Sequence, residues 1–173
     1  MKSKMKRWLS LSLLLLLGAC ASYGGRGLMP GQDRLENVVR VMGQPAMQWQ
    51  NADGSKQLAY PRGPMGHHTF MVYIEADGTL QKIENVLEPK YFKRIQVGMN
   101  QQEVLRILGP SYPGWTDIFE RRDELVWEWR YCDDWSASAR FDVLFDNSSG
   151  IVRSTMGMSE SQRGLCGRGA CAC

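Results

Sequence analysis

The chain has 173 residues and a formal net charge of +3. Residues 1–19 hold four positive and no negative charges, so the 154 residues after them keep a net charge of −1. A near-neutral body argues against a nucleic-acid partner held by phosphate contacts and against a polybasic membrane patch. The length suits one domain of ordinary size, or two very small ones that pack together.

The amino-terminal segment has the pattern of a signal peptide. Four basic residues come first, and an apolar run from Trp8 to Leu17 ends in small residues. This run is about 10 residues long, whereas a helix that spans a membrane needs roughly 20. Residues 1–19 are therefore predicted to be a signal peptide that is removed from the mature protein.

The end of this segment, Leu17-Gly18-Ala19-Cys20, resembles the lipobox of bacterial lipoproteins. The resemblance implies cleavage before Cys20 and attachment to membrane lipid through acyl chains, such as palmitate, on Cys20. Several acyl chains hold a protein stably on a membrane. Residue 21 is alanine and not the aspartate that retains such proteins in the inner membrane, which implies an outer-membrane anchor facing the periplasm. The alternative is an ordinary secretory signal that contains a cysteine.

Two helical segments with the same signals follow. Asp33 and Asn100 are each followed three residues later by a glutamate, Glu36 or Glu103, which is the spacing of a capping box. Apolar residues then recur on one face of each segment. Gly43 and Gly109, each with a proline within two residues, mark the predicted helix ends.

Each helical segment precedes strand-like runs. The first contains Leu58 and Tyr60, then residues 70–74, a turn at Asp77-Gly78 and residues 79–86. The second contains Leu125 to Tyr131, then residues 141–145, a turn at residues 147–150 and residues 151–158. These patterns predict an α+β fold of two tandem units, each a short helical section followed by a three-stranded antiparallel sheet. Residues 20–27 are the expected linker, 28–87 the first unit, 88–160 the second and 161–173 a flexible Cys-rich tail.

The two units resemble the SmpA/OmlA family, whose best-known member is the BamE lipoprotein of the β-barrel assembly machinery. In the second unit the resemblance rests on Gly98-Met99, Leu108-Gly109-Pro110, Trp127-Glu128-Trp129 and the segment from Phe141 to Gly150. The first unit matches through Gly31, Gly43-Gln44-Pro45 and Asp77-Gly78. Typical members have a single copy, whereas this chain has two. A tandem pair also resembles the fold of secreted β-lactamase inhibitor proteins, although a shared fold does not transfer function.

Several polar and aromatic residues are candidate sites. The segment from Glu124 to Cys132 places Leu125, Trp127, Trp129 and Tyr131 on one face, where a core role is favoured over a binding patch. Trp115 and Trp135 fall in loop-like segments and are candidate partner contacts. His67 and His68 are expected to be exposed at a strand start, and residues 120–124 to form a solvated loop. Asp133-Asp134 is a common pair of loop acids without specific meaning.

Four cysteines remain besides Cys20, namely Cys132, Cys166, Cys171 and Cys173. Disulfides are expected because the periplasm permits them. Four thiols allow three pairings, and the sequence does not choose among them. Free thiols and a soft metal are the alternatives, but the C-x4-C-x-C spacing differs from that of structural zinc sites, so no metal or other cofactor is expected.

No catalytic motif is present: the sequence lacks H-E-x-x-H, G-x-S-x-G and a phosphate-binding glycine loop. The resulting expectation is a non-enzymatic interaction or scaffold module that supports envelope integrity or β-barrel outer-membrane protein assembly. Its expected partners are membrane lipid and a protein of the envelope machinery. The alternatives are a periplasmic inhibitor or ligand-binding module that uses a concave surface, and a metal or redox role for the tail.

Overall fold

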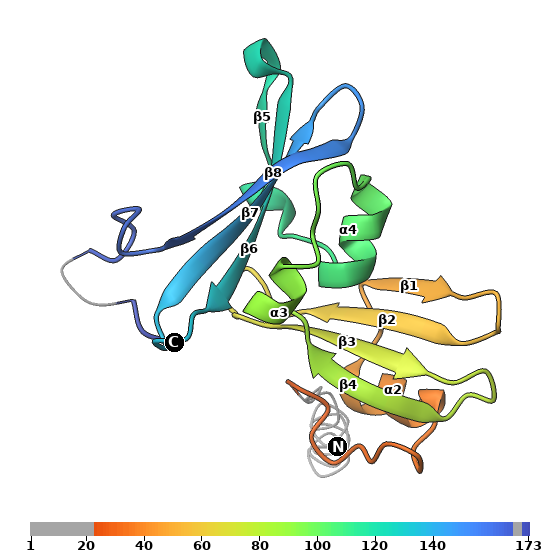
Figure 1. Cartoon of the computed structure of the whole chain (residues 1–173). Helices are drawn as coiled ribbons and strands as arrows, with labels where there is room; N and C mark the ends of the chain where they lie inside the picture. Colours follow the sequence, from red (N-terminus) through yellow and green to blue (C-terminus); the bar gives the residue numbers. More distant parts are fainter. Residues whose placement is uncertain (1–22, 168–170) are drawn as a thin grey trace, which may run out of the picture.

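The computed structural model describes residues 23–167 and 171–173 (Figure 1). The predicted signal peptide and residues 20–22 of the expected linker, Cys20 among them, lie outside the described residues. The described residues form a mixed α+β fold with two four-stranded antiparallel sheets and few helices. Among the described residues, no helix is long and apolar enough to cross a membrane.

The N-terminal sheet has the strand order β1-β2-β3-β4 and follows helix α2 (Leu35–Met42). Its strands are β1 (Met47–Gln50), β2 (Lys56–Pro61), β3 (Thr69–Ile74) and β4 (Leu80–Asn85). The expected turn at Asp77-Gly78 joins β3 to β4, and Gly78 adopts a φ of 90° there. The prediction of three strands was wrong because β1 adds a fourth strand at the edge, paired with β2 from Met47 to Gln50.

The C-terminal sheet has the order β5-β6-β7-β8 and follows two helices, α3 (Pro89–Phe92) and α4 (Gln101–Leu108). Its strands are β5 (Asp117–Phe119), β6 (Glu124–Cys132), β7 (Ser138–Asp146) and β8 (Ile151–Ser159), with the 3-10 turns η1 (Pro113–Trp115) and η2 (Glu120–Arg122) on either side of β5. The short edge strand β5 again makes four strands where three were predicted.

Of the two predicted capping boxes, one is present in the structure and one is not. At α4 the capping box is present: the Asn100 side chain accepts from the Glu103 backbone N–H at 3.1 Å, and Glu103 accepts from the Asn100 N–H at 2.7 Å. At α2 the prediction was wrong. Arg34 is the N-cap and makes no side-chain cap, because Asp33 accepts hydrogen bonds from the Met29 backbone and the Asn37 side chain instead.

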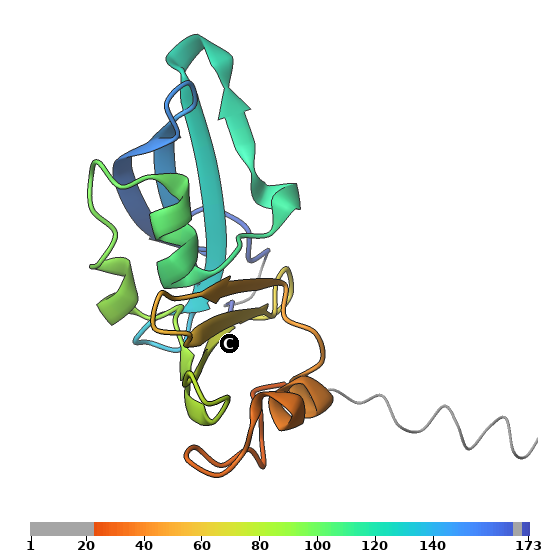
Figure 2. The same ribbon diagram turned by 90° about the vertical axis from the view of Figure 1, so that its right-hand side faces the viewer.

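Both faces of the N-terminal sheet are covered (Figures 1 and 2). Leu58 and Tyr60 pack with Val38 and Met42 of α2 on one face. On the other face, residues of β2 and β3 join a core shared with α3, α4 and the C-terminal sheet: Ala59, Met71, Phe92, Val104, Leu108, Trp129 and Phe141. The expected core role of the aromatic face of β6 is confirmed. The two sheets are therefore joined by a common apolar core.

Candidate functional site

A pocket of about 260 Å³ opens where the two sheets meet. Four segments give most of its lining: the start of β1, the β2–β3 loop, the chain from Pro110 to Trp115, and β6. Aromatic and apolar side chains dominate its lining, and a few polar groups join them; the residues used below are Met47, His68, Tyr112, Trp115, Trp129 and Arg130. An apolar recess with few polar groups is the usual form of a binding site.

Trp129 and Gly109 fix the wall of the pocket. The buried Trp129 indole Nε1–H donates to the Gly109 carbonyl oxygen at 3.2 Å, which ties β6 to the end of α4. Gly109 has a φ of 70°, and a Cβ there would lie 2.8 Å from the Thr69 methyl group of β3. Glycine is thus required both by the backbone conformation and by the close approach of the end of α4 to β3.

Tyr112 and Trp115 form the outer rim of the pocket. Their rings meet edge to face with centroids 5.2 Å apart. The guanidinium of Arg140 lies over the Trp115 ring, 3.8 Å from its centroid, which holds the indole by a cation–π contact. Tyr112 is 41% exposed, so its ring is available to a partner.

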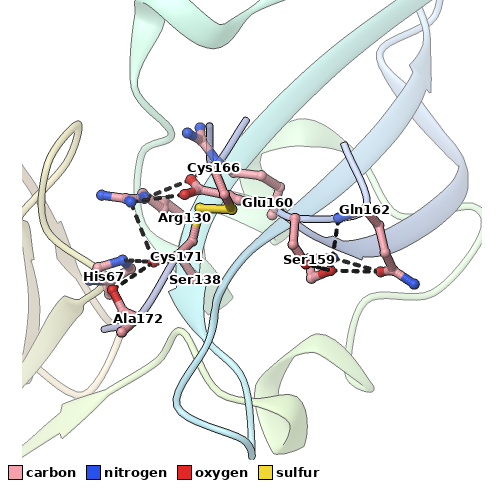
Figure 3. Close-up of a disulfide and its surroundings, with 11 residues drawn as sticks. His67, Arg130, Ser138, Ser159, Glu160, Gln162, Cys166, Cys171 and Ala172 are labelled. Atoms are coloured by element: carbon pink, nitrogen blue, oxygen red, sulfur yellow. Dashed lines mark hydrogen bonds and ion pairs between the residues drawn. A yellow bond between two sulfur atoms is a disulfide. The ribbon is translucent and has the colours of Figure 1, made fainter. Parts of the chain in front are cut away.

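The β2–β3 loop carries the two histidines, and the expectation that they would be exposed was wrong, because both are half-buried. His68 lines the pocket, stacks on Phe70 and shares a hydrogen bond with the Tyr23 hydroxyl at 3.0 Å. His67 points away from it to the Ser138 hydroxyl at 2.8 Å (Figure 3). Burial lowers the pKa of both imidazoles; the charge of Arg130 lowers that of His67 further, whereas Glu88 opposes the shift at His68.

Behind the pocket, an ion network covers the outer face of the C-terminal sheet. Glu160, only 3% exposed, accepts from the Arg130 Nε at 2.7 Å and from the Arg140 Nε at 2.6 Å. Burial alone would raise the pKa of Glu160, but hydrogen bonds from both arginines outweigh it and the pKa lies below its usual range. Arg130 also donates to the Met65 carbonyl at 3.0 Å, which links this network to the β2–β3 loop.

The network continues into the tail through Arg163, which pairs with Glu128 and Asp142. Asp142 is 3% exposed, and its Oδ1 atom has no hydrogen-bond partner in the described structure. Burial raises the pKa of Asp142 to about 6; Arg163 opposes this shift, and the nearby Glu128 charge adds to it.

The structure pairs the four candidate cysteines as Cys132–Cys173 and Cys166–Cys171. The last residues return to the sheet, since the Ser138 N–H donates to the Cys171 carbonyl at 2.7 Å and the Cys173 N–H donates to the Ser136 carbonyl at 3.0 Å. The Cys166–Cys171 disulfide lies beside Arg130 and Glu160 (Figure 3). The described part of the tail is therefore joined to the outer face of the sheet.

The two candidate contact tryptophans lie in different recesses. Trp115 lines the junction pocket, whereas Trp135 lines a separate shallow recess with Tyr131 and Met158 and is 89% exposed. Asp133 next to it stabilises the β6–β7 turn, accepting from the Trp135 and Ala137 backbone N–H groups at 2.9 Å.

The segment 120–124 is only partly exposed to solvent. Its first three residues are exposed, but the Glu124 side chain is only 12% exposed and pairs with Arg122 and Arg153. The expectation of a fully solvated loop was therefore wrong.

Sequence reasoning missed the contribution of the β2–β3 loop to the pocket. A signal was available: seven residues separate β2 from β3, more than the two to five of a common hairpin loop, and these seven residues are rich in Gly and Pro.

In comparisons with known proteins, no family model matches the chain and no curated protein matches it.

Proposed function

We propose that the chain is an outer-membrane-anchored periplasmic lipoprotein of two tandem SmpA/OmlA-like units. It would act as an interaction or scaffold module in envelope integrity or in β-barrel outer-membrane protein assembly. The lipobox-like segment that ends at Cys20 supports the anchor. The aromatic pocket at the junction of the two sheets supports the interaction role, since Trp, Tyr and Arg are the residues that most often dominate binding energy at interfaces.

The position of Tyr23 carries the proposal. Its hydroxyl bonds the His68 Nδ1 at 3.0 Å, and its carbonyl oxygen accepts from the Arg62 Nε at 2.7 Å. Tyr23 is three residues after Cys20, and three residues span at most about 11 Å. Acylation of Cys20 would therefore hold the β2–β3 loop, and with it the junction pocket, beside the membrane surface. Confinement in such a thin layer raises the effective concentration for partners in the same membrane.

The pocket lies at the small end of the range of sizes for small-molecule sites. Small-molecule sites commonly measure about 300–1,000 Å³, and the junction pocket measures about 260 Å³. A pocket of this size suits one anchoring side chain of a partner, with neighbouring contacts on the surface around it.

Co-purification from outer membranes in gentle detergent tests this function, with wild type beside Cys20→Ser and partners identified by mass spectrometry. The proposal expects envelope or barrel-assembly proteins with wild type and their loss with Cys20→Ser. If neither protein retains such a partner, or if both retain the same one, tethering is not the mechanism.

The apolar and aromatic lining of the pocket supports a second candidate, a periplasmic inhibitor or ligand-binding module. This candidate does not need the anchor. It expects the Cys20→Ser protein to keep full binding activity in solution, which is the opposite of the tethered-module expectation.

A further inference from the structure

Three residues with metal-binding side chains come together beside the junction. They are His67 of the β2–β3 loop, Cys132 at the end of β6 and Cys173 at the end of the chain. Their potential ligand atoms all lie within 4.8 Å of one another. In the state that the structure shows, the two sulfur atoms are bonded to each other as a disulfide.

Reduction of this disulfide would release a ligand set of two thiols and an imidazole. With a phosphine reductant, the phosphorus gives two electrons to the S–S bond and takes the oxygen of one water molecule. The bond breaks, and the two protons of that water complete the Cys132 and Cys173 thiols. Metal binding then displaces both thiol protons, because the thiolate is the ligand.

The cluster is held in place by contacts other than the disulfide. The Cys173 N–H donates to the Ser136 carbonyl at 3.0 Å, and Ala172 pairs with Ala137 in a β-bridge. His67 bonds the Ser138 hydroxyl through Nε2, which leaves Nδ1 as the second ring nitrogen (Figure 3). Metal-binding histidines commonly hold their other ring nitrogen in such a bond. The three side chains are thus positioned by backbone and side-chain contacts that reduction does not remove.

We propose that the reduced protein binds a thiophilic divalent cation of the zinc class through His67, Cys132 and Cys173. Two thiolates and one imidazole form a ligand set found in zinc proteins, and a fourth position remains for water or another ligand. Because His67 belongs to the N-terminal half and the cysteines to the C-terminal half, the ion would join the two halves at the junction. The same two sulfur atoms serve either the disulfide or the metal, so oxidation and metal binding exclude each other.

Cobalt(II) is the probe, because cobalt–thiolate bonds give a charge-transfer absorption band. The full chain is purified in detergent and reduced with a phosphine, with Cys20→Ser as the common background so that this thiol does not bind metal. One equivalent of cobalt is expected to bind. His67→Ala should weaken binding by roughly tenfold or more, since affinity depends on the number of ligands. Cys132→Ser should weaken binding likewise and reduce the thiolate band, because only the Cys173 thiolate remains at this site. The matched control, Cys166→Ser with Cys171→Ser, should bind as well as the parent.

A second measurement does not depend on the folding of variants. Zinc is added to the reduced parent protein, which is then alkylated and analysed by mass spectrometry. Protection of Cys132 and Cys173, with Cys166 and Cys171 still modified, is the expected result. Equal protection of all four cysteines, protection of the tail pair alone, or cobalt binding that His67→Ala leaves unchanged would overturn the proposed site.

Discussion

The indole N–H of Trp129 donates to the carbonyl oxygen of Gly109 at 3.2 Å, and this bond lies in the core shared by the two sheets. Gly109 ends α4 at the point where the helix meets β3. The junction that forms the pocket therefore depends on a residue without a side chain.

Gly109→Ala should destabilise the protein more than Gly98→Ala. Both glycines have positive φ, 70° and 94°, so each alanine is strained by roughly 1–3 kcal/mol; at Gly109 the ψ of −177° lies in a region that is essentially limited to glycine. A Cβ at Gly98 meets nothing within 4 Å, whereas one at Gly109 meets the Thr69 methyl at 2.8 Å. Overpacking should add about 2 kcal/mol at Gly109. Urea unfolding of both variants measures the difference, and equal losses would show that the end of α4 and β3 move apart to admit the methyl group without cost.

Glu160→Gln should be strongly destabilising. The change leaves the half-buried Arg130 and Arg140 without their shared carboxylate, although Arg140 keeps its ion pair with Glu128, and breaking a largely buried ion pair from one side costs roughly 3 kcal/mol. Glu88→Gln is the matched control, since Glu88 pairs with Lys90 at 2.9 Å on the surface, with side chains 41% and 65% exposed, and should change little. Chemical denaturation of both variants checks this, and a loss at Glu160 no larger than at Glu88 would contradict the network's structural role.

The buried carboxyl of Asp142 predicts a pH dependence. Its pKa of about 6 in the folded protein lies above the ordinary value of 3.8. Between these values the folded state holds more protons than the unfolded state, so the free energy of unfolding rises as pH falls through 6 and levels off near 4. Relative to Asp142→Asn, wild type should gain about 2 kcal/mol between pH 7 and pH 4. The comparison cancels the opposite trend expected from Glu160, whose pKa is lowered. A stability difference that does not vary with pH would show that Asp142 titrates normally.

The two disulfides should differ in their contribution to stability. The Cys132–Cys173 bond closes a separation of 41 residues and the Cys166–Cys171 bond a separation of 5. Since the entropy of loop closure grows with the logarithm of loop length, removing the first pair as a double serine variant should cost about 1–2 kcal/mol more than removing the second. Thermal unfolding without reductant measures both, and a larger loss from removing the short-loop pair would contradict this prediction.

The sequence predicted the structure correctly where the signal depends on neighbouring residues. The Asn100–Glu103 capping box, the turns at Asp77-Gly78 and at residues 147–150, and the alternation along β6 each depend on neighbouring residues, and each is present. Edge strands were missed because β1 and β5 have only four and three residues, too few for a clear period. The Asp33 cap failed because residues 29–33 form a turn that uses the Asp33 carboxylate.

The candidate site was less predictable because it depends on contacts far apart in the chain. Trp115 is a candidate from the sequence alone, but Arg140 of β7 contacts its ring from within the C-terminal half, and the β2–β3 loop reaches the pocket only through the packing of one sheet on the other. The consecutive burial of residues 57–60 reflects the same packing, since the N-terminal sheet is covered on both faces. No local pattern distinguishes such a doubly covered strand from a short apolar run.

Site-specific photo-crosslinking in intact cells tests the central claim most directly. A photoreactive residue replaces Tyr112 on the pocket rim, or Phe119 on β5 as the control; their exposed fractions are 41% and 42%. The account predicts that Tyr112 forms a crosslink to an envelope protein, that Cys20→Ser abolishes it, and that Phe119 forms no such crosslink. Equal crosslinking from both positions, or a Tyr112 crosslink that persists in the Cys20→Ser protein, would contradict a membrane-tethered module that binds its partner at the junction pocket.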